Sequence, residues 1–420
     1  MLNTRIKASA LDMPVTEFIL KRIEELRLEG HPPRTLFAAC PNSLSVIKAA
    51  LRAAKRNNAP IKFAATLNQV DGDGGYTGLT QKDFVRLIRI ESAAINYEGV
   101  SIIAIDHGGP WLKDIQTKEK WDLVKAMAAI KKSFEDAVDA GYDLIHVDPT
   151  IDIFLDLGEV IDISLVVDRT IELIEHVENY RTARGLSRIS YEVGTEEVHG
   201  GLADDAVFDT FLKLLKDGLK SKNLGDVWPC FIVGKVGTDL HTTDFDSQVA
   251  KDLTTKVKAY GSLIKGHYSD DVSNPEDYPL SGMGAANVGP EFTISEYKAL
   301  IELEGLEKKL YRDDRIALFS DIQNILWRAV LDSNRWQKWL QPEEQNMAFY
   351  DIALDRQQWI IMTCCRYIWQ NHEVLVSRQL LYDNLSKNGY DAQEIVLSRI
   401  ERDMDKYFIN FNLVNLNNYL

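Results

Sequence analysis

The sequence has few of the features that mark secreted, membrane or redox proteins. It holds four cysteines in 420 residues, Cys40, Cys230, Cys364 and Cys365, and none of them forms a CxxC pair. This argues against a disulfide framework or a thiolate zinc site and favours buried, reduced thiols. No segment approaches the roughly 18 consecutive apolar residues of a membrane span. We therefore expect a soluble, cytoplasmic protein with no membrane partner.

Basic clusters are also missing. The chain has 63 acidic and 48 basic residues, a net charge of -15, and no basic block. This argues against nucleic acid as a partner, although a few local donors can still hold a phosphate. The glycine-rich segments 68–78 and 281–290 match neither a Walker nor a dinucleotide motif. The first can close over a substrate and the second lies where many barrels hold phosphate, but tight turns explain both equally well.

The chain does contain a series of short apolar runs that end in acidic residues, histidine or glycine. They read TLFAACPN, IKFAATLNQVDGDGG, VSIIAIDHGGP, LIHVDPT, ISYEVGTEEVHGG, CFIVGKVGTDLH, LIKGHYSDD and AANVGPEFT. In a (β/α)8 barrel the carboxyl ends of the strands converge on one mouth, where the chemistry takes place. A strand followed by an ordinary polar turn explains any single run, but the repetition favours a barrel mouth.

Segments with helical periodicity separate these runs. They span 43–57, 80–97, 118–140, 158–184, 203–222, 247–260 and 295–310. Alternating strands and helices predict parallel strands joined by right-handed crossovers. We expect an α/β fold, a (β/α)8 TIM barrel over 35–310, with an N-terminal helical segment at 1–34 and a C-terminal helical domain at 311–420.

The C-terminal segment contains most of the tryptophans at helical spacing. They are Trp327, Trp336, Trp339, Trp359 and Trp369. A sugar-stacking platform is one interpretation, but a helical core that packs on the barrel or forms an oligomer contact fits the spacing better. We expect a homo-oligomer.

Histidine is scarce, with eight residues in the chain. Five of them lie at or just after the strand ends: His107, His146, His199, His241 and His267. A lone histidine is more often structural, but several at one mouth favour a metal site. Imidazoles beside carboxylates suit a divalent ion, zinc or manganese.

Asp106 directly precedes His107 and is the first candidate for proton transfer. An ion at the mouth can polarise a ketose carbonyl, while this carboxylate moves the proton of a hydroxyl beta to that carbonyl. Retro-aldol cleavage needs this combination. Asp148 and Glu192, on the fourth and fifth runs, are the next catalytic candidates.

The motif NQVDGDGGYTGLTQKDF is accompanied by DHGGP, by HVD in LIHVDPT and by GTE in EVGTEE. The motifs LIKGHYSDD, NVGP, RWQKWL and RYIW follow further along the chain. Together they resemble the accessory (Z-type) subunit family of class II tagatose-bisphosphate aldolases, which includes ketose and ketose-phosphate 4-epimerases. The resemblance covers nearly the whole chain.

The resemblance implies a barrel related to zinc-dependent aldolases that acts on a ketose or ketose phosphate. By strand order it implies His107, His241 and His267 as metal ligands, and Glu192 or Glu196 as supporting acids. We also expect six residues of these segments to contact the substrate: Asn68, Gln69, Glu196, Lys235, Asp270 and Asn287.

Three functions remain open at this point. The leading hypothesis is a metal-dependent enzyme that works at C4 by retro-aldol and aldol steps, either a 4-epimerase or a tagatose-bisphosphate aldolase. The alternative is a non-catalytic partner that stabilises a class II aldolase catalytic subunit. The third is a barrel isomerase that moves protons through an enediol without breaking a carbon–carbon bond.

Overall fold

A closed barrel of eight parallel strands forms the centre of the molecule. The computed structural model describes residues 2–156, 159–194, 205–239 and 243–420. Neighbouring strands pair in sequence order, and β1 closes the barrel against β8. The strands are β1 (Leu36–Ala39), β2 (Ile61–Thr66), β3 (Ser101–Gly108), β4 (Leu144–Val147), β5 (Ser190–Gly194), β6 (Phe231–Val233), β7 (Leu263–Gly266) and β8 (Ala285–Val288). The predicted (β/α)8 fold is confirmed.

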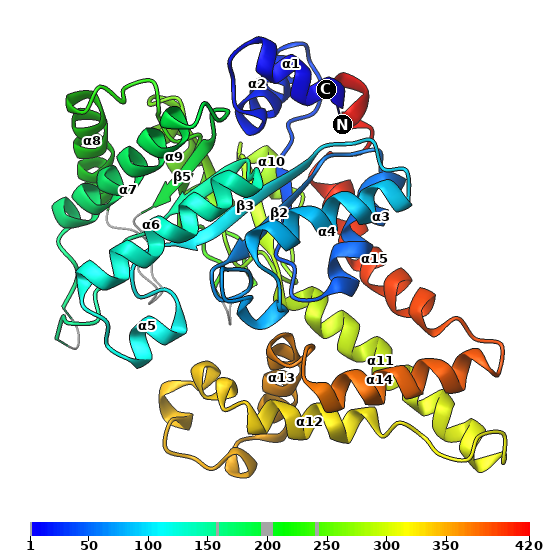
Figure 1. The fold of residues 1–420 in the computed structure, drawn as a ribbon. Coiled ribbons are helices and arrows are strands. Elements are labelled where there is room, and N and C mark those ends of the chain that lie inside the picture. The colour runs from blue at the N-terminus through cyan, green and yellow to red at the C-terminus, as the bar shows by residue number, and fades with distance from the viewer. Residues whose placement is uncertain (1, 157–158, 195–204, 240–242) are drawn as a thin grey trace.

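Helices cover the outside of this barrel (Figure 1). Those up to β8 are α1 (Leu2–Ala10), α2 (Val15–Leu28), α3 (Leu44–Arg56), α4 (Gln81–Ala94), α5 (Asp114–Lys118), α6 (Leu123–Ala140), α7 (Ile163–Ala183), α8 (Asp205–Ser221), α9 (Ser247–Lys258) and α10 (Asp277–Leu280). Those after it are α11 (Pro290–Arg312), α12 (Ile322–Asp332), α13 (Leu354–Cys364), α14 (His372–Ser386) and α15 (Ala392–Asn410). Among the described residues, no helix is both long and apolar enough to cross a bilayer.

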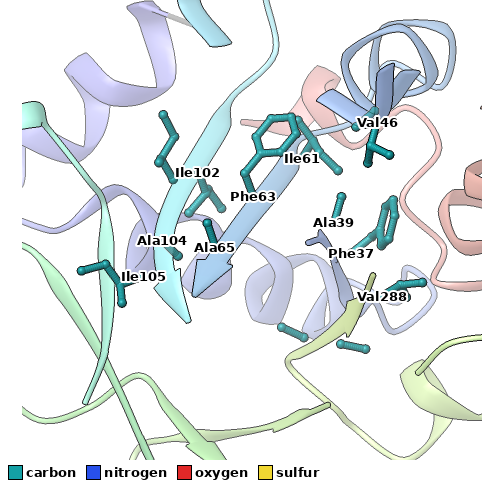
Figure 2. Close-up of a cluster of buried hydrophobic side chains, with 14 of the residues drawn as sticks. Phe37, Ala39, Val46, Ile61, Phe63, Ala65, Ile102, Ala104, Ile105 and Val288 are labelled. Carbon is teal, nitrogen blue, oxygen red and sulfur yellow. The ribbon is translucent and has the colours of Figure 1, made fainter. Parts of the chain in front are cut away.

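Each strand has one face towards the helices and one towards the barrel interior, because side chains alternate along a strand. Figure 2 shows the outward side of β1 and β2, where Phe37, Ala39, Ile61, Phe63 and Ala65 cluster with Val46 of α3. Lys62 lies between two of these outward residues and therefore points into the barrel. An inward lysine in an apolar strand needs a partner, since an unpaired buried charge is costly.

The C-terminal segment divides into two parts. Helices α12, α13 and α14 form a separate group (Figure 1), and we call residues 313–391 the cap. Helix α15 then returns to the barrel, where it packs on both α3 and α11. The cap is therefore inserted between two helices that belong to the barrel layer, and the proposed boundary at 310/311 falls in the last turn of α11.

Aromatic packing holds α15 and the cap in place. The Tyr407 ring stacks on Phe37 of β1 with 5.2 Å between centroids. Trp336 and Trp369 are buried, and the other three C-terminal tryptophans are partly buried against the same core. The predicted burial of this aromatic segment agrees with the structure.

The two chain ends lie side by side (Figure 1). Lys7 Nζ donates a hydrogen bond of 2.6 Å to the carbonyl oxygen of Leu420. Arg22 Nε donates one of 3.2 Å to the carbonyl oxygen of Tyr419. The N-terminal helices therefore pack beside the end of the C-terminal segment.

Removing the Phe408 side chain should loosen α15 from the barrel. Phe408 is fully buried, and its ring lies edge-on to Phe37 at 5.2 Å. We expect Phe408→Ala to lower the free energy of unfolding by about 3–5 kcal/mol, measured by urea denaturation. Ile409→Ala is the matched control, because Ile409 is 58% exposed and its loss should cost within about 0.5 kcal/mol. Equal losses in the two variants would contradict this packing.

Candidate metal and catalytic site

Four side chains meet at the carboxyl ends of three strands. Asp106 and His107 come from β3, His146 from β4, and His267 directly follows β7. Each offers one ligand atom, and these atoms all lie within 4.8 Å of one another. The ring centroids of His107 and His267 are 4.5 Å apart, and that of His146 lies 4.9 and 5.5 Å from them.

A local break in β3 brings two consecutive residues to the same side. The pairing of β3 with β4 shifts between Ile105 and Gly108, and His107 has a left-handed φ of 49°. Neighbouring residues of a regular strand point to opposite faces, but here Asp106 and His107 both line the same cavity. Gly109 lets the chain pass β4 closely, because a Cβ there would lie 1.8 Å from the carbonyl oxygen of Asp148.

Asp148 lies behind His107 and fixes its ring. Its Oδ2 is 2.6 Å from His107 Nδ1, and its Oδ1 accepts a hydrogen bond of 2.5 Å from the Thr150 hydroxyl. Burial alone would raise the pKa of Asp148, but the hydrogen bond and charge of His107 hold this pKa at about 2. A carboxylate on Nδ1 directs Nε2 towards a ligand, as in carboxylate–histidine–metal arrangements.

The other two imidazoles lie over the same pair of carboxylates. His267 Nε2 is 3.6 Å from Asp106 Oδ1 and 3.5 Å from Glu192 Oε1. His146 Nδ1 is 3.7 and 3.4 Å from the same two oxygens, and it accepts a hydrogen bond from the backbone N–H of His107. Burial lowers the pKa of His146, so its ring is neutral at neutral pH.

Two buried lysines balance these carboxylates. Lys265 Nζ lies 3.1 Å from Asp106 Oδ1 and 2.5 Å from Glu192 Oε1, and Lys62 Nζ lies 3.2 Å from Glu192 Oε2. Burial would raise the pKa of both acids, but the positive charges around them, Lys265 first, hold the pKa of each well below its usual range. Burial lowers the pKa of Lys62, whereas the two carboxylates raise that of Lys265 despite its burial. Asp106 and Glu192 are therefore ionised at neutral pH.

A cavity of about 220 Å³ opens above Asp106, His107 and His267. Four of the predicted substrate-binding residues line it: Asn68, Gln69, Asp270 and Asn287. Asn287 Nδ2 donates a hydrogen bond of 3.0 Å to Asp106 Oδ1, and its Oδ1 is buried with no hydrogen-bond partner among the described residues. Asn287 therefore steadies the carboxylate and still presents an acceptor.

The amides of Asn68 and Gln69 are bonded to the protein itself. Gln69 Nε2 donates to the oxygens of Pro41 and Asn42, and its Oε1 accepts from the backbone N–H of Thr66. Asn68 similarly joins the backbone of Leu112 to that of Asp114. These bonds show that both amides shape the cavity wall.

The remaining predicted residues lie away from this cavity or outside the described residues. Glu192 lies beneath the imidazoles and Asp148 behind them, and neither lines the cavity. Lys235, in the loop after β6, is also absent from the described part of its lining. His241 and Glu196 lie outside the described residues, so their roles stay predictions.

Sequence reasoning missed three groups of residues here. His146 was placed at its strand end but was not included among the ligands. Lys62 and Lys265 each lie inside an apolar strand run, and this position is the one sequence signal that could have indicated a buried ion pair. The cap supplies one wall of the cavity, which the sequence did not indicate: Arg335, Lys338, Trp339, Arg366 and Tyr367.

The residues present fit a divalent ion. Three imidazoles with ring centroids 4.5 to 5.5 Å apart form a nitrogen donor set that such an ion takes, and the ionised Asp106 beside them offsets part of its charge. Burial and the Asp106 charge raise the pKa of the nearby Cys40 thiol, so a thiolate ligand is not part of this set. The buried cluster is thus suited to hold a metal.

Comparison with known proteins gives the family. Residues 20–406 match the model described as D-tagatose-1,6-bisphosphate aldolase subunit GatZ/KbaZ-like. The chain belongs to this family. A probable tagatose 6 phosphate kinase from Sinorhizobium meliloti 1021 shares the fold, at 18% identity and a TM-score of 0.74, over 90% of this chain and 100% of that one. The fructose-bisphosphate aldolase of Campylobacter jejuni also shares it, at 12% identity and a TM-score of 0.55, over 96% of each chain.

Lys265 should be essential for the stability of this GatZ/KbaZ-like barrel. Lys265→Met leaves Asp106 and Glu192 with one counter-charge fewer in a buried site, so we expect a loss of about 3–5 kcal/mol in urea denaturation. The double variant Lys265→Met/Asp106→Asn removes one charge of each sign and should recover much of that loss. Lys251→Met, at an exposed position of α9, should stay within about 0.5 kcal/mol of the parent. A double variant that is less stable than Lys265→Met would contradict the pairing.

Proposed function

We propose that this protein is a metal-dependent enzyme acting at C4 of a ketose or ketose phosphate by retro-aldol and aldol steps. One observation carries the proposal: an ionised Asp106 lies in a cluster with three imidazoles, and Asp106, His107 and His267 of this cluster line a cavity. The family match and the aldolase-like fold support carbon–carbon bond chemistry on a sugar. Zinc is the ion we propose first, with manganese as the alternative.

The ligand set that we propose includes His107 and His267, with His146 as the third imidazole among the described residues and His241 as the candidate outside them. A bound divalent ion would polarise the ketose carbonyl and favour the enediolate. Asp148 orients His107, and Asn287 together with Lys265 orients Asp106.

Asp106 accepts the proton of the C4 hydroxyl in this proposal. Its low pKa keeps the carboxylate ionised, and therefore in the acceptor form, across the neutral range. Breaking the C3–C4 bond then yields an aldehyde and an enediolate. Return of the proton after re-addition to the opposite face of the aldehyde completes a 4-epimerisation. Transfer of that proton to C3 of the enediolate, followed by release of the two fragments, is an aldolase reaction.

The second candidate is a non-catalytic role. The matched family is described as an aldolase subunit, which favours a partner that stabilises a class II aldolase catalytic chain. Such a role needs neither bound metal nor Asp106. A homo-oligomer is part of the proposal in either case.

The variant Asp106→Asn distinguishes the enzymatic function from the non-catalytic role. The amide keeps the shape of the carboxylate and loses the proton acceptor, so we expect metal content and fold to be retained while turnover falls about 100- to 10,000-fold. The assay screens C4-epimeric ketoses and their phosphates, with metal content measured on the same samples. Asp168→Asn, at an exposed position of α7, is the control and should be unchanged. Full turnover by Asp106→Asn would rule out this base.

The metal requirement has its own test. His107→Ala should lose both bound metal and turnover, because it removes a ligand that Asp148 holds in place. A protein that purifies without metal, turns over no ketose and raises the stability of a co-expressed aldolase would instead support the scaffold. Isotope labels at C3 and C4 distinguish bond cleavage from an enediol isomerase, because only cleavage allows a labelled aldehyde to be exchanged into the product.

A further inference from the structure

The cap wall of the cavity is rich in positive charge. Arg335, Lys338 and Arg366 all line it, together with the rings of Trp339 and Tyr367. This wall comes from chain segments far from the barrel strands that carry Asp106 and His107. The imidazole cluster of the proposed metal site does not use any of these cap residues.

Arg366 is buried without a hydrogen-bonded counter-ion among the described residues. Arg366 is only 8% exposed, and neither its Nε nor its Nη2 has a hydrogen-bond partner among these residues. The guanidinium lies 4.3 Å from the Trp339 ring centroid and 5.1 Å from that of Tyr367. Cation–π contacts stabilise the charge but do not satisfy the N–H donors of the guanidinium. A buried charge in this state costs stability, which suggests that it serves a ligand.

The two other cap cations already share a partner. Arg335 Nη2 lies 2.6 Å from Asp114 Oδ2, and Lys338 Nζ contacts the other oxygen of that carboxylate. One carboxylate therefore faces two cations. Arg366 adds a third cation to this wall. The charge of Asp270, which lines the same cavity, acts on it, but neither Nε nor Nη2 of Arg366 has a hydrogen-bond partner among the described residues.

The usual alternative site for an anion is occupied by the chain itself. In many barrels the N-terminus of the helix after β8 holds phosphate. Here Asp270 Oδ1 accepts hydrogen bonds of 2.9 and 2.8 Å from the backbone N–H groups of Gly289 and Glu291, where α11 begins. These backbone N–H groups are therefore already used by a carboxylate of the chain. The glycine-rich segment 281–290 is thus a poorer place for phosphate than Arg366.

We infer that Arg366, supported by Arg335, binds an oxyanion at the end of the sugar substrate that lies away from Asp106. A guanidinium offers paired donors that match phosphate or carboxylate oxygens. The substrate is then an anionic ketose, either a phosphate ester or a sugar acid. For the sugar itself this inference rests on the proposed function, but the anion site can be tested without turnover.

The test measures binding by calorimetry to the protein as purified, with three unreactive six-carbon probes. Sorbitol 6-phosphate carries a phosphate, gluconate carries a carboxylate, and sorbitol is neutral. We expect at least one charged probe to bind about tenfold or more tightly than sorbitol, and the stronger of the two identifies the oxyanion. Arg366→Met should abolish this preference while leaving sorbitol binding unchanged. Arg366→Lys, which keeps the charge and loses the fork of donors, should retain part of it.

Two controls keep a failure to fold distinct from a loss of binding. Arg399→Met changes another arginine of the C-terminal segment, one that pairs with Glu302 on the surface, and should keep the full preference. Arg366→Met should melt at or above the temperature of the parent, because it removes a buried charge without a hydrogen-bonded counter-ion. A clear drop in melting temperature would show that Arg366 is structural and would overturn the inference.

The outcomes also separate this inference from the proposed function. Equal binding of all three probes, binding of none, or an undiminished preference in Arg366→Met would overturn the anion site. Turnover of neutral ketoses with no such preference would leave the C4 chemistry standing alone. If the preference depends on Arg366 but the protein turns over no ketose, the anion site is supported and the proposed enzymatic function is rejected.

Discussion

The Lys265 ammonium, held between Asp106 and Glu192, is the interaction on which the site depends. Two carboxylates buried in the barrel interior would otherwise take up protons, because burial disfavours their charge. With the lysine in place both stay ionised, and the imidazoles of His146 and His267 lie over the same two oxygens. The site is built on strands rather than loops, so the positions of these groups are fixed by the barrel closure.

The sequence indicated the barrel because every strand carries its own signal. A short apolar run that ends in a polar residue is readable without knowing what lies next to it. The pairs Asp106–Lys265 and Glu192–Lys62 are different, because they join strands that are far apart in the chain. Their contact depends on register and barrel curvature, which a single sequence does not encode in any local pattern.

The cap was the largest gap in the sequence reasoning for a similar reason. Helical spacing predicted that Trp336 and Trp369 are buried, and they are. The same spacing gave no sign that Arg366 turns towards the barrel mouth. Its position depends on how the segment Cys365–Tyr367 packs on α11 and on residues Gly75–Thr77. Buried polar atoms without a hydrogen-bond partner lower the stability of a folded protein. Such atoms, here in Arg366 and in the side-chain oxygen of Asn287, are therefore more informative about function than the aromatic pattern around them.

The return of α15 to the barrel also decides how the cap can move. A domain joined to its neighbour through one linker swings freely, whereas the cap is joined at both ends to helices packed in the barrel wall. Two attachments restrict rotation and keep the distance between the mouth and the cap wall nearly constant. With the anionic end of the substrate at the cap, as we infer, the length of the sugar chain would determine which of its carbons lies against the strands.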